Sequence, residues 1–533
     1  MRRLLALLVS FAVVPILAPA AGAAEITIED DIVVESFDGT PIVATLMLPA
    51  GASESSRVPA ILQTHGWGGS RSTTPAGILQ RLLDQGYAVL TWDSRGFGES
   101  GGEANVGAPG FEVEDAKALL SYLASRPEIR TDGPDDPRVG WIGGSNAAGV
   151  QFNTAALDDR VEAIVPEISW GDLVQDLAPN GVVKQSWDAL LYAVGVAATP
   201  NGLQSPAGPQ TGIYAQQIHQ AFVESAIGTL SEPIRQWFGF RSTTARSQDI
   251  RTPTMIVQGS IDTLFPLEDA FQNYLQIKAS KTPVKLMTYC SGHTIAGCVY
   301  PGGASGYPEG AEGRAPVYED RIVAWLDRYV KGRRWAPIGP EVEWQAQDGR
   351  YYGATRYPLP GTDAVPGEVV QTGTILGPGP GGGDGPADGN PAPDEELGRS
   401  AARAPVVGPF SEARSILGVP RVHLTGSVIG VQGFAFLELV DVSPDGTRVT
   451  LDDQVMPVAL AGGAVNRTVD LHGVSWRLEP GHVLELEITT GSTQYAIPRT
   501  GPYALTLSAA STIPLTTQSK FGPPFPVPPF QAR

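Results

Sequence analysis

Cysteine, basic residues and long apolar runs are all scarce in this chain. Of its 533 residues, two are cysteines, Cys290 and Cys298, and neither follows the apolar N-terminal run, which argues against anchoring as a bacterial lipoprotein. The 37 Lys and Arg residues stand against 56 Asp and Glu, a formal net charge of −19. Such a surface repels nucleic acid and anionic membranes. No later apolar run is long enough to cross a bilayer. We therefore expect neither a nucleic-acid nor a membrane partner.

The first 23 residues have the pattern of a secretory signal peptide. Arg2 and Arg3 form a charged start, residues 4–17 an apolar middle, and Ala21-Gly22-Ala23 a small-residue cleavage site. We expect this segment to be removed and the mature protein to be secreted, that is, extracellular.

Apolar runs of strand length alternate with helical patterns from residue 58 to residue 166 and again from 254 to 330. Before them, residues 26–48 alternate polar and apolar around Asp38-Gly39, as an antiparallel hairpin does. Strands that alternate with helices predict a parallel, doubly wound sheet. The interruption at about 169–250 is rich in aromatic residues and predicts an inserted helical cap. Three of its aromatics, Trp170, Trp187 and Trp237, are candidates to line a substrate pocket.

The helical signal disappears in the C-terminal part of the chain. Short alternating runs recur there, separated by turns such as Pro444-Asp445-Gly446, which predicts an all-β jelly roll. The expected division of the chain is a signal peptide at 1–23, a doubly wound α/β domain at 24–338 with its cap, a β jelly-roll domain at 339–515 with a disordered Gly/Pro-rich insertion at about 376–394, and an extended tail at 516–533.

Ser145 is the predicted nucleophile. It ends the segment Arg138-Val-Gly-Trp-Ile-Gly-Gly-Ser145, where an apolar strand stops at two glycines before a small-residue helix. This is the pattern of a strand-to-helix elbow, which exposes a serine hydroxyl at the top of a sheet. The position two residues after the serine, usually glycine, holds Ala147, still a small residue. Ser100 matches the G-x-S-x-G pattern to the letter, but it lies in a Gly-rich loop that opens no helix, so Ser145 is preferred.

His293 is the predicted base. A serine hydroxyl needs an imidazole to take its proton, and the chain order in doubly wound hydrolases is serine, acid, histidine. Of the six histidines, only His293 lies in the sheet domain after Ser145. It is flanked by Cys290 and Cys298, which an oxidising compartment would join in a disulfide that staples the histidine loop. Two unpaired buried thiols are the alternative.

Asp262 is the predicted acid, just past the end of the strand at 254–259, with Glu268 as the fallback.

The oxyanion of a tetrahedral intermediate needs hydrogen-bond donors. We expect the backbone N–H of Asn146 and of Trp67, in the Gly-rich loop Thr64-His-Gly-Trp-Gly-Gly69, to supply them, with the Trp67 indole as a further donor and His65 as a brace of this loop.

No metal, nucleotide or redox-cofactor motif is present, so we expect an enzyme without a cofactor or metal. The spacing of Asp132-Gly-Pro-Asp-Asp136 fits no calcium loop and indicates a solvated turn. The sequence alone leaves the oligomeric state open.

The motifs in this order resemble the X-prolyl dipeptidyl-peptidase and cocaine-esterase family of α/β-hydrolases. The resemblance is carried by Thr64-His-Gly-Trp67, the Asp93–Ser100 loop, the Ser145 elbow, Asp262 and His293. Segments of the β domain such as Gly418-Val-Pro-Arg-Val-His-Leu-Thr-Gly426 resemble that family's C-terminal jelly roll.

The resemblance implies hydrolysis of esters or amides, with the cap and the β domain together closing a pocket over Ser145. Some members release Xaa-Pro dipeptides, and others cleave aryl, acyl or amino-acid esters. Members often have tyrosine where Trp67 and Asn146 stand, which favours ester over peptide cleavage here. A peptidase would also need a carboxylate for the substrate's ammonium group, for which Glu167, Asp172 and Glu224 are candidates. A non-catalytic binding protein, or a β domain that targets the enzyme to a glycan or surface, stays open as another class.

Overall fold

The structure is a computed structural model of the 533-residue chain. It describes residues 25–198, 205–208, 213–293, 317–346, 349–378, 402–492, 494–495 and 501–517. The predicted signal peptide, residues 379–394 of the predicted insertion, and residues 518–533 of the predicted tail lie outside the described residues.

Within the described residues, ten strands form one sheet in the order β1-β2-β4-β3-β8-β9-β11-β12-β13-β14. They are Thr27–Glu35 (β1), Pro41–Leu48 (β2), Ala60–Thr64 (β3), Ala88–Trp92 (β4), Val139–Gly144 (β8), Ala163–Glu167 (β9), Thr254–Gly259 (β11), Val284–Tyr289 (β12), Val342–Gln345 (β13) and Tyr351–Ala354 (β14). The seven strands β4, β3, β8, β9, β11, β12 and β13 run parallel, and β1, β2 and β14 are joined antiparallel at the two edges. The predicted N-terminal hairpin and parallel sheet are confirmed.

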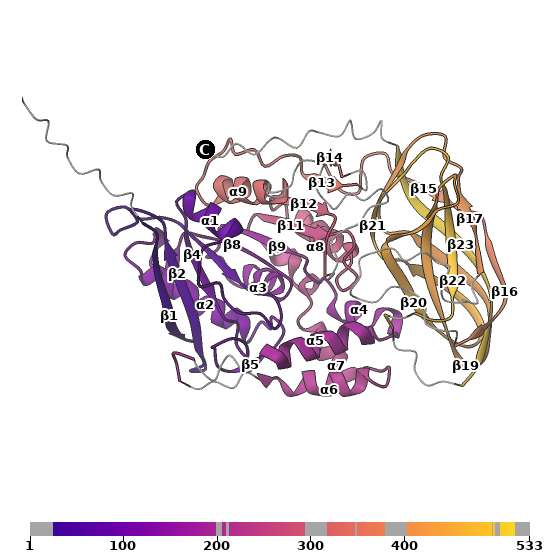
Figure 1. Ribbon diagram of the computed structural model, residues 1–533, viewed down its shortest axis with the longest axis horizontal. Coiled ribbons are helices and arrows are strands. Elements are labelled where there is room, and N and C mark those ends of the chain that lie inside the picture. The colour runs from indigo at the N-terminus through magenta and orange to yellow at the C-terminus, as the bar shows by residue number, and fades with distance from the viewer. Residues whose placement is uncertain are drawn as a thin grey trace, which may run out of the picture.

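Helices cover both faces of this sheet, as Figure 1 shows. Helices α2 (Glu112–Ser125), α3 (Asn146–Ala155) and α8 (Leu267–Ala279) pack on one face, and α1 (Gly77–Asp84) and α9 (Val317–Tyr329) on the other. Strands buried on both faces need apolar residues at successive positions. This explains why β4, in which Thr91 is the one polar residue, is buried along its whole length.

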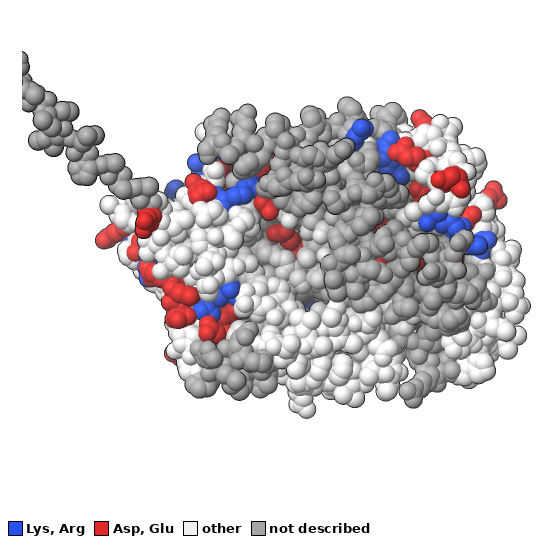
Figure 2. All heavy atoms as spheres, viewed as in Figure 1, with Lys and Arg blue, Asp and Glu red and all other residues white. Residues whose placement is uncertain are grey.

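The segment between β9 and β11 forms the helical cap. It contains α4 (Leu173–Leu177), α5 (Gln185–Ala198), α6 (Gln216–Ser225) and α7 (Glu232–Gly239). Shorter elements are the 3-10 turns Pro179–Gly181, Thr243–Ala245 and Ser247–Asp249, the paired short strands β5 (Glu103–Ala104) and β10 (Ile213–Tyr214), and the hairpin of β6 (Thr131–Gly133) and β7 (Asp136–Pro137). Figure 2 shows a largely uncharged surface over the cap on this face, whereas acidic side chains gather over the end of the molecule that holds β1.

The C-terminal part forms a separate all-antiparallel β domain with its own apolar core, as predicted. Its strands are β15 (Asp363–Pro366), β16 (Val370–Gly377), β17 (Ala402–Val407), β18 (Arg414–Gly418), β19 (Arg421–Val442), β20 (Arg448–Asp470), β21 (Val474–Leu478), β22 (Val483–Thr489) and β23 (Tyr503–Thr517). In Figure 1 this domain stands beside the end of the first sheet, near α8 and the cap.

The first sheet extends past the boundary predicted at residue 339. Strand β13 pairs in parallel with β12, and β14 pairs with β13, so the sheet continues to Ala354. Without these two strands β12 would be an open edge, and a sheet edge with unpaired backbone groups is a liability that proteins cover. Among the described residues, no helix has both the length and the apolar content needed to span a membrane.

Candidate active site

Ser145 lies on a sharp turn between β8 and α3. Its backbone has φ 58° and ψ −124°, a conformation that L-residues rarely adopt and that surrounding structure must hold. The Ser145 N–H donates to the carbonyl of Glu167 in β9 (N···O 2.9 Å), which fixes the turn against the sheet. Gly143 has φ 146°, and a Cβ there would come within 3.0 Å of the Ala147 Cβ. Alanine at 147 is therefore accommodated because residue 143 is glycine.

The structure brings Ser145, His293 and Asp262 together in one hydrogen-bonded line. The His293 Nε2 lies 2.8 Å from the Ser145 Oγ, and the His293 Nδ1 lies 2.7 Å from Asp262 Oδ2. A proton on Nδ1 leaves Nε2 as an acceptor facing the serine hydroxyl. The arrangement can therefore move a proton from the serine to the imidazole while the carboxylate stabilises the charge that forms.

The carboxylate of Asp262 is fully buried and held on both oxygens. While Oδ2 faces the imidazole, Oδ1 accepts the backbone N–H groups of Leu264 (3.0 Å) and Phe265 (2.8 Å). The Phe265 ring also meets the His293 ring edge to face, with centroids 5.0 Å apart. These contacts fix both the orientation of the carboxylate and the plane of the imidazole.

Two backbone N–H groups stand beside the serine as candidate oxyanion donors. Asn146 begins α3, so its N–H is one of the unpaired donors at a helix N-terminus. Trp67 and Asn146 both line the same pocket as Ser145. Within the described residues, neither backbone N–H donates a hydrogen bond to the protein.

The indole of Trp67 is not available to the oxyanion, contrary to the expectation that it would be a further donor. Its Nε1–H donates to the carbonyl oxygen of Leu191 in α5 (3.0 Å). The loop that carries Trp67 is braced by His65, as expected. The His65 Nδ1 lies 2.7 Å from the carbonyl oxygen of Gly66, and its Nε2 accepts the N–H of Ser94 (3.0 Å).

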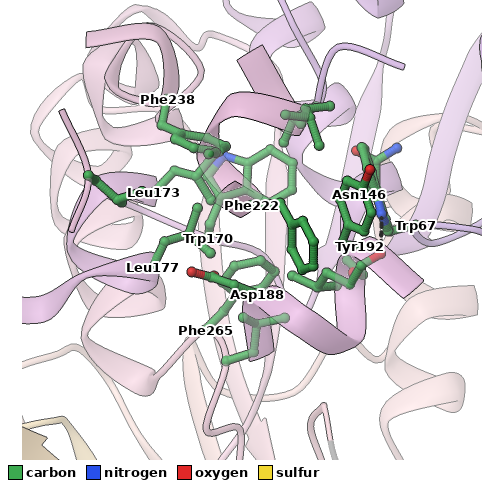
Figure 3. Close-up of a pocket in the computed structure, with 17 residues that line it drawn as sticks. Trp67, Asn146, Trp170, Leu173, Leu177, Asp188, Tyr192, Phe222, Phe238 and Phe265 are labelled. Carbon is green, nitrogen blue, oxygen red and sulfur yellow. Dashed lines mark hydrogen bonds between the residues drawn. The ribbon is translucent and has the colours of Figure 1, made fainter. Parts of the chain in front are cut away.

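The pocket in front of Ser145 contains about 740 Å³ of space not filled by atoms, including the part that opens to solvent. Its wall is almost wholly apolar and is drawn in Figure 3. Besides Ser145, Asn146 and Trp67, the residues that line it are Val106, Trp170, Leu173, Leu177, Asp188, Leu191, Tyr192, Ile218, Ala221, Phe222, Leu230, Phe238, Leu264 and Phe265. In the described part of the chain, all of its lining comes from the hydrolase domain and the cap. No described residue of the β domain lines this pocket, so the closure by the β domain that the resemblance implied stays a prediction.

Of the three tryptophans predicted to line the pocket, only Trp170 does so among the described residues. Trp187 lies behind His293, with ring centroids 6.1 Å apart, and its Nε1–H donates to Thr263 Oγ1 (3.1 Å). The Arg241 guanidinium lies over the Trp237 ring, with its Cζ 3.3 Å from the ring centroid. Aromatic content located the cap but could not show which rings face inward.

Asp188 is the one charged side chain among the described residues that line the pocket, and sequence reasoning missed it. In Figure 3 its carboxyl group lies on the opposite side of the pocket from Asn146 and Trp67. Burial raises the pKa of Asp188 to about 7, against the opposing effects of Ser225 and Lys184. The available signal was that Asp188 is the single charged residue of the largely apolar helix α5.

The three carboxylates considered as ammonium ligands do not line the pocket. Glu167 lies at the end of β9, where burial, and secondarily Glu319, raises its pKa to about 7. Asp172 caps α4 by accepting the N–H groups of Val174 and Gln175. Glu224 accepts the N–H of Ser231 (2.6 Å).

The alternative serine and the alternative acid have other contacts. Ser100 is fully buried, and its Oγ donates to the carbonyl of Asp93 (2.7 Å) and accepts the Val43 N–H (2.8 Å). Glu268 accepts hydrogen bonds from His472 Nδ1 (2.6 Å) and the Gly473 N–H (2.7 Å) of the β domain. Neither side chain has a hydrogen bond to the histidine next to Ser145.

Two predictions remain untested at this site. Cys290 is buried beside Ile261, but Cys298 lies outside the described residues, so their disulfide stays a prediction. Within the described residues, no three His, Cys, Asp or Glu side chains are grouped so that they could hold a metal ion. The absence of a cofactor likewise stays a prediction.

Two family models match this chain. Residues 38–295 match the X-Pro dipeptidyl-peptidase (S15 family), and residues 338–521 match the X-Pro dipeptidyl-peptidase C-terminal non-catalytic domain. Over 145 residues, the chain is 31% identical to an uncharacterized 31.7 kDa protein in the traX-finO intergenic region of Escherichia coli. That match covers 27% of this chain and 47% of the relative, so the chain spans about half the length of this curated relative.

Solved structures superpose over most of this chain. A CocE/NonD family hydrolase from Staphylococcus aureus superposes with a TM-score of 0.65 at 13% identity, covering 92% of this chain and 94% of that one. An alpha-amino acid ester hydrolase also superposes with a TM-score of 0.65, at 15% identity, covering 94% of this chain and 98% of that one. At these identities the likeness shows the fold alone. The two family models, which together match most of the chain, confirm the resemblance: the chain belongs to the X-Pro dipeptidyl-peptidase (S15) family of serine hydrolases.

Proposed function

We propose that this protein is a secreted serine hydrolase that cleaves carboxylic esters through a covalent acyl-enzyme. The observation that carries the proposal is the unbroken line from Ser145 Oγ through the His293 ring to Asp262, beside an apolar pocket. A serine is a weak nucleophile until a base oriented by a carboxylate removes its proton, and this line supplies both groups.

The proposed reaction has two halves. His293 Nε2 takes the proton of Ser145 as Oγ attacks the ester carbonyl carbon, and His293 then gives that proton to the departing alkoxide. A water molecule next attacks the acyl-enzyme while His293 removes a proton from that water. His293 then returns this proton to Ser145 Oγ as the acid product leaves. Asp262 orients the imidazole and stabilises its positive charge without itself becoming protonated.

The N–H groups of Asn146 and Trp67 are the proposed donors to the oxyanion in both halves. Their backbone positions are set before the substrate binds, by the start of α3 and by the loop that His65 braces. Donors that need no reorganisation stabilise the charge of the transition state more than that of the neutral carbonyl.

The pocket favours an ester over an N-terminal dipeptide. An Xaa-Pro dipeptidyl-peptidase must hold a substrate ammonium group, and among the described lining residues only Asp188 carries a carboxyl group. Because burial raises the pKa of Asp188 to about 7, a large share of it is uncharged at neutral pH. Apolar acyl groups need no such partner and match the rest of the wall.

Replacement of Ser145 tests the proposed nucleophile. Ser145→Ala should abolish both turnover of a p-nitrophenyl acyl ester and covalent labelling by an active-site phosphonate. Ser100→Ala is the matched control, because it removes the hydroxyl of the other G-x-S-x-G sequence, and it should keep the labelling. Full labelling of Ser145→Ala would overturn the assignment.

Substrate preference is tested with one pair of assays on the unmodified protein. We expect kcat/KM for a p-nitrophenyl acyl ester to exceed that for a Gly-Pro anilide. A higher value for the anilide would reverse the ranking in favour of the Xaa-Pro dipeptidyl-peptidase.

A binding protein on an inactive hydrolase fold is the alternative of another class. The hydrogen bonds between Ser145, His293 and Asp262 argue against it, because an inactive site has no need to keep all three side chains in line. Tight binding of an insoluble polysaccharide by the full chain, without turnover in an ester panel, would favour this alternative.

Secretion and the Cys290–Cys298 disulfide belong to the same proposal. Export past a signal peptidase would leave a mature N-terminus near residue 24, which N-terminal sequencing of the exported protein would detect. Mass spectrometry of peptides from the non-reduced protein would show the disulfide as one cross-linked pair.

A further inference from the structure

The loop at residues 260–266, here called the acid loop, carries Asp262 from the end of β11 to the start of α8. The cap holds one part of it. Lys184, which is fully buried, donates from Nζ to the carbonyl oxygens of Thr263 (2.8 Å) and Leu264 (3.1 Å). The β domain holds the acid residue itself, because Gln454 Nε2 donates to the carbonyl oxygen of Asp262 (3.0 Å).

Gln454 reaches the acid loop from an irregular part of β20. In the β19–β20 ladder, Glu438 pairs with Val455 and Val440 pairs with Thr450, so residues 451–454 all face the single residue Leu439. Two consecutive residues of this bulge have positive φ, Asp452 (49°) and Asp453 (58°). Positive φ at non-glycine residues is costly and persists where the surroundings require it, most often near functional sites.

The amide of Gln454 is tightly held. Its Nε2 donates to the carbonyl of Asp452 (3.1 Å) as well as to that of Asp262, which uses both of its N–H groups. The Gln454 residue is 7% exposed, so water does not compete freely for these bonds. The amide therefore acts as a fixed link between the bulge and the backbone of Asp262.

The β domain also packs against the helix that follows the acid loop. His472 and the Gly473 N–H both donate to the Glu268 carboxylate in the first turn of α8. A Cβ at Gly473 would come within 2.8 Å of the Glu268 backbone nitrogen, so the two domains fit closely there. The β domain thus contacts the acid loop and the first turn of α8, whereas no described β-domain residue lines the substrate pocket.

We propose that Gln454 is a positioning residue, through which the β domain holds Asp262 in register with His293. The inference rests on the proposed function, because it assigns Gln454 a role in aligning that site. A residue that aligns the acid should affect kcat and the basicity of the imidazole, and it should leave KM nearly unchanged because it does not touch the pocket. If Gln454 only strengthened the contact between the two domains, its replacement would lower stability and leave kcat and the pH profile unchanged.

The test replaces Gln454 by methionine, which keeps the length of the side chain and removes its N–H donors. We expect kcat on a p-nitrophenyl ester to fall about tenfold with KM within about twofold of the original value. A carboxylate that is less well aligned stabilises the imidazolium less, so the acidic limb of the kcat/KM profile should move to lower pH.

The matched control is Arg467→Met, at another contact between the same domain and the cap. Arg467 donates from Nη2 to Asn180 Oδ1 (2.7 Å) and from Nη1 to the Ala459 carbonyl (3.0 Å), so these hydrogen bonds do not involve the acid loop. This variant should lower the thermal midpoint while leaving kcat and the acidic limb unchanged. An equal loss of kcat in Arg467→Met would show a general effect of domain docking and overturn the role of Gln454.

A readout independent of turnover separates this inference from the proposed function. The proton of the His293 Nδ1–H···Asp262 hydrogen bond is expected far downfield in the proton NMR spectrum, and it should move upfield in Gln454→Met. An unchanged resonance and an unchanged kcat would overturn the positioning role, even if Ser145→Ala abolishes turnover. Should Gln454→Met yield no folded protein by circular dichroism, Gln454→Asn, which keeps the amide but shortens its reach, takes its place with the same expected outcomes.

Discussion

A hydrogen bond between Trp67 and Leu191 joins the loop at residues 64–69 to the cap. The indole Nε1–H of Trp67 donates to the carbonyl oxygen of Leu191 across 3.0 Å, and the indole ring stacks on Tyr214 with centroids 5.3 Å apart. The loop that follows β3 is thus attached to α5 and to Tyr214, the last residue of β10. In the proposed reaction the backbone N–H of Trp67 donates to the oxyanion, and contact with the cap fixes the side chain of the same residue.

Replacing Trp67 by phenylalanine tests this attachment. The phenyl ring keeps most of the apolar contact and loses the hydrogen bond, at a cost of about 1 kcal/mol in the free energy of unfolding. We expect kcat to fall about fivefold, because the backbone N–H at position 67 is then aimed less firmly at the oxyanion. Urea unfolding and steady-state kinetics measure the two effects. Trp335→Phe is the matched control at a residue that is 84% exposed, and an equal loss of kcat there would contradict the interpretation.

Replacing Asp188 by asparagine should change how stability depends on pH. Burial raises the pKa of Asp188 from 3.8 to about 7, so the folded protein keeps a proton that the unfolded chain releases. For an acid with a raised pKa, the folded state therefore loses stability as pH rises from about 4 to about 7. Asparagine does not titrate, so the thermal midpoint of Asp188→Asn should rise relative to that of the original protein across this window and level off above it.

The control for that experiment is Asp84→Asn, at an exposed residue of α1. Because Asp84 is exposed, this variant should not show the rise in relative thermal midpoint between about pH 4 and about pH 8 that burial of Asp188 predicts. If Asp188→Asn gave the same difference at both pH values, Asp188 would be ionised throughout, and the pocket would offer a permanent negative charge to a substrate.

Gly149 in α3 packs directly on the ring of Trp170 in the pocket wall. A Cβ at position 149 would lie 2.0 Å from Cζ2 of that ring, a distance that requires the ring or the helix to move. Alanine favours a helix by about 1 kcal/mol over glycine, but overpacking in a core costs about 1–3 kcal/mol or more. We therefore expect Gly149→Ala to lower the free energy of unfolding and to raise KM, because Trp170 lines the pocket.

Urea unfolding of Gly110→Ala is the comparison for this prediction. A Cβ at Gly110 would meet no atom within 4 Å, so the substitution should leave stability nearly unchanged. Equal stability of the two variants would mean that α3 moves away from Trp170 at little cost.

Local patterns predicted most of the fold and part of the candidate site. The predicted strand at 254–259 has the bounds of β11, and Ser145 lies on the predicted elbow, with a φ of 58°. Helix α8 was not assigned, although its buried residues Leu267, Phe271 and Tyr274 follow the helical spacing. The continuation of the first sheet into β13 was missed for another reason: pairing with β12 depends on a long-range contact that a run of four residues cannot indicate.

The side chains that decide specificity and alignment were less accessible to sequence reasoning. Asp188 stands out as a charge in an apolar helix, but only the packing of α5 shows that it faces the pocket. Gln454 carries no motif, and its contact with the Asp262 carbonyl joins residues 192 positions apart. The expectation that the Trp67 indole donates to the oxyanion was wrong. The position of its N–H depends on the side-chain rotamer, which is set by contact with the cap and not by the local sequence.

By itself, the sequence determined the local events: where strands and helices alternate, where two glycines allow a strained serine, and the order in which serine, acid and histidine follow along the chain. Only the tertiary structure decided that these groups meet, that Asp188 lines the pocket and that the β domain forms a hydrogen bond to the acid loop. Local conformation depends on neighbours within a few residues, whereas a hydrogen bond such as that between His293 and Ser145, 148 positions apart, depends on the order of strands in the whole sheet.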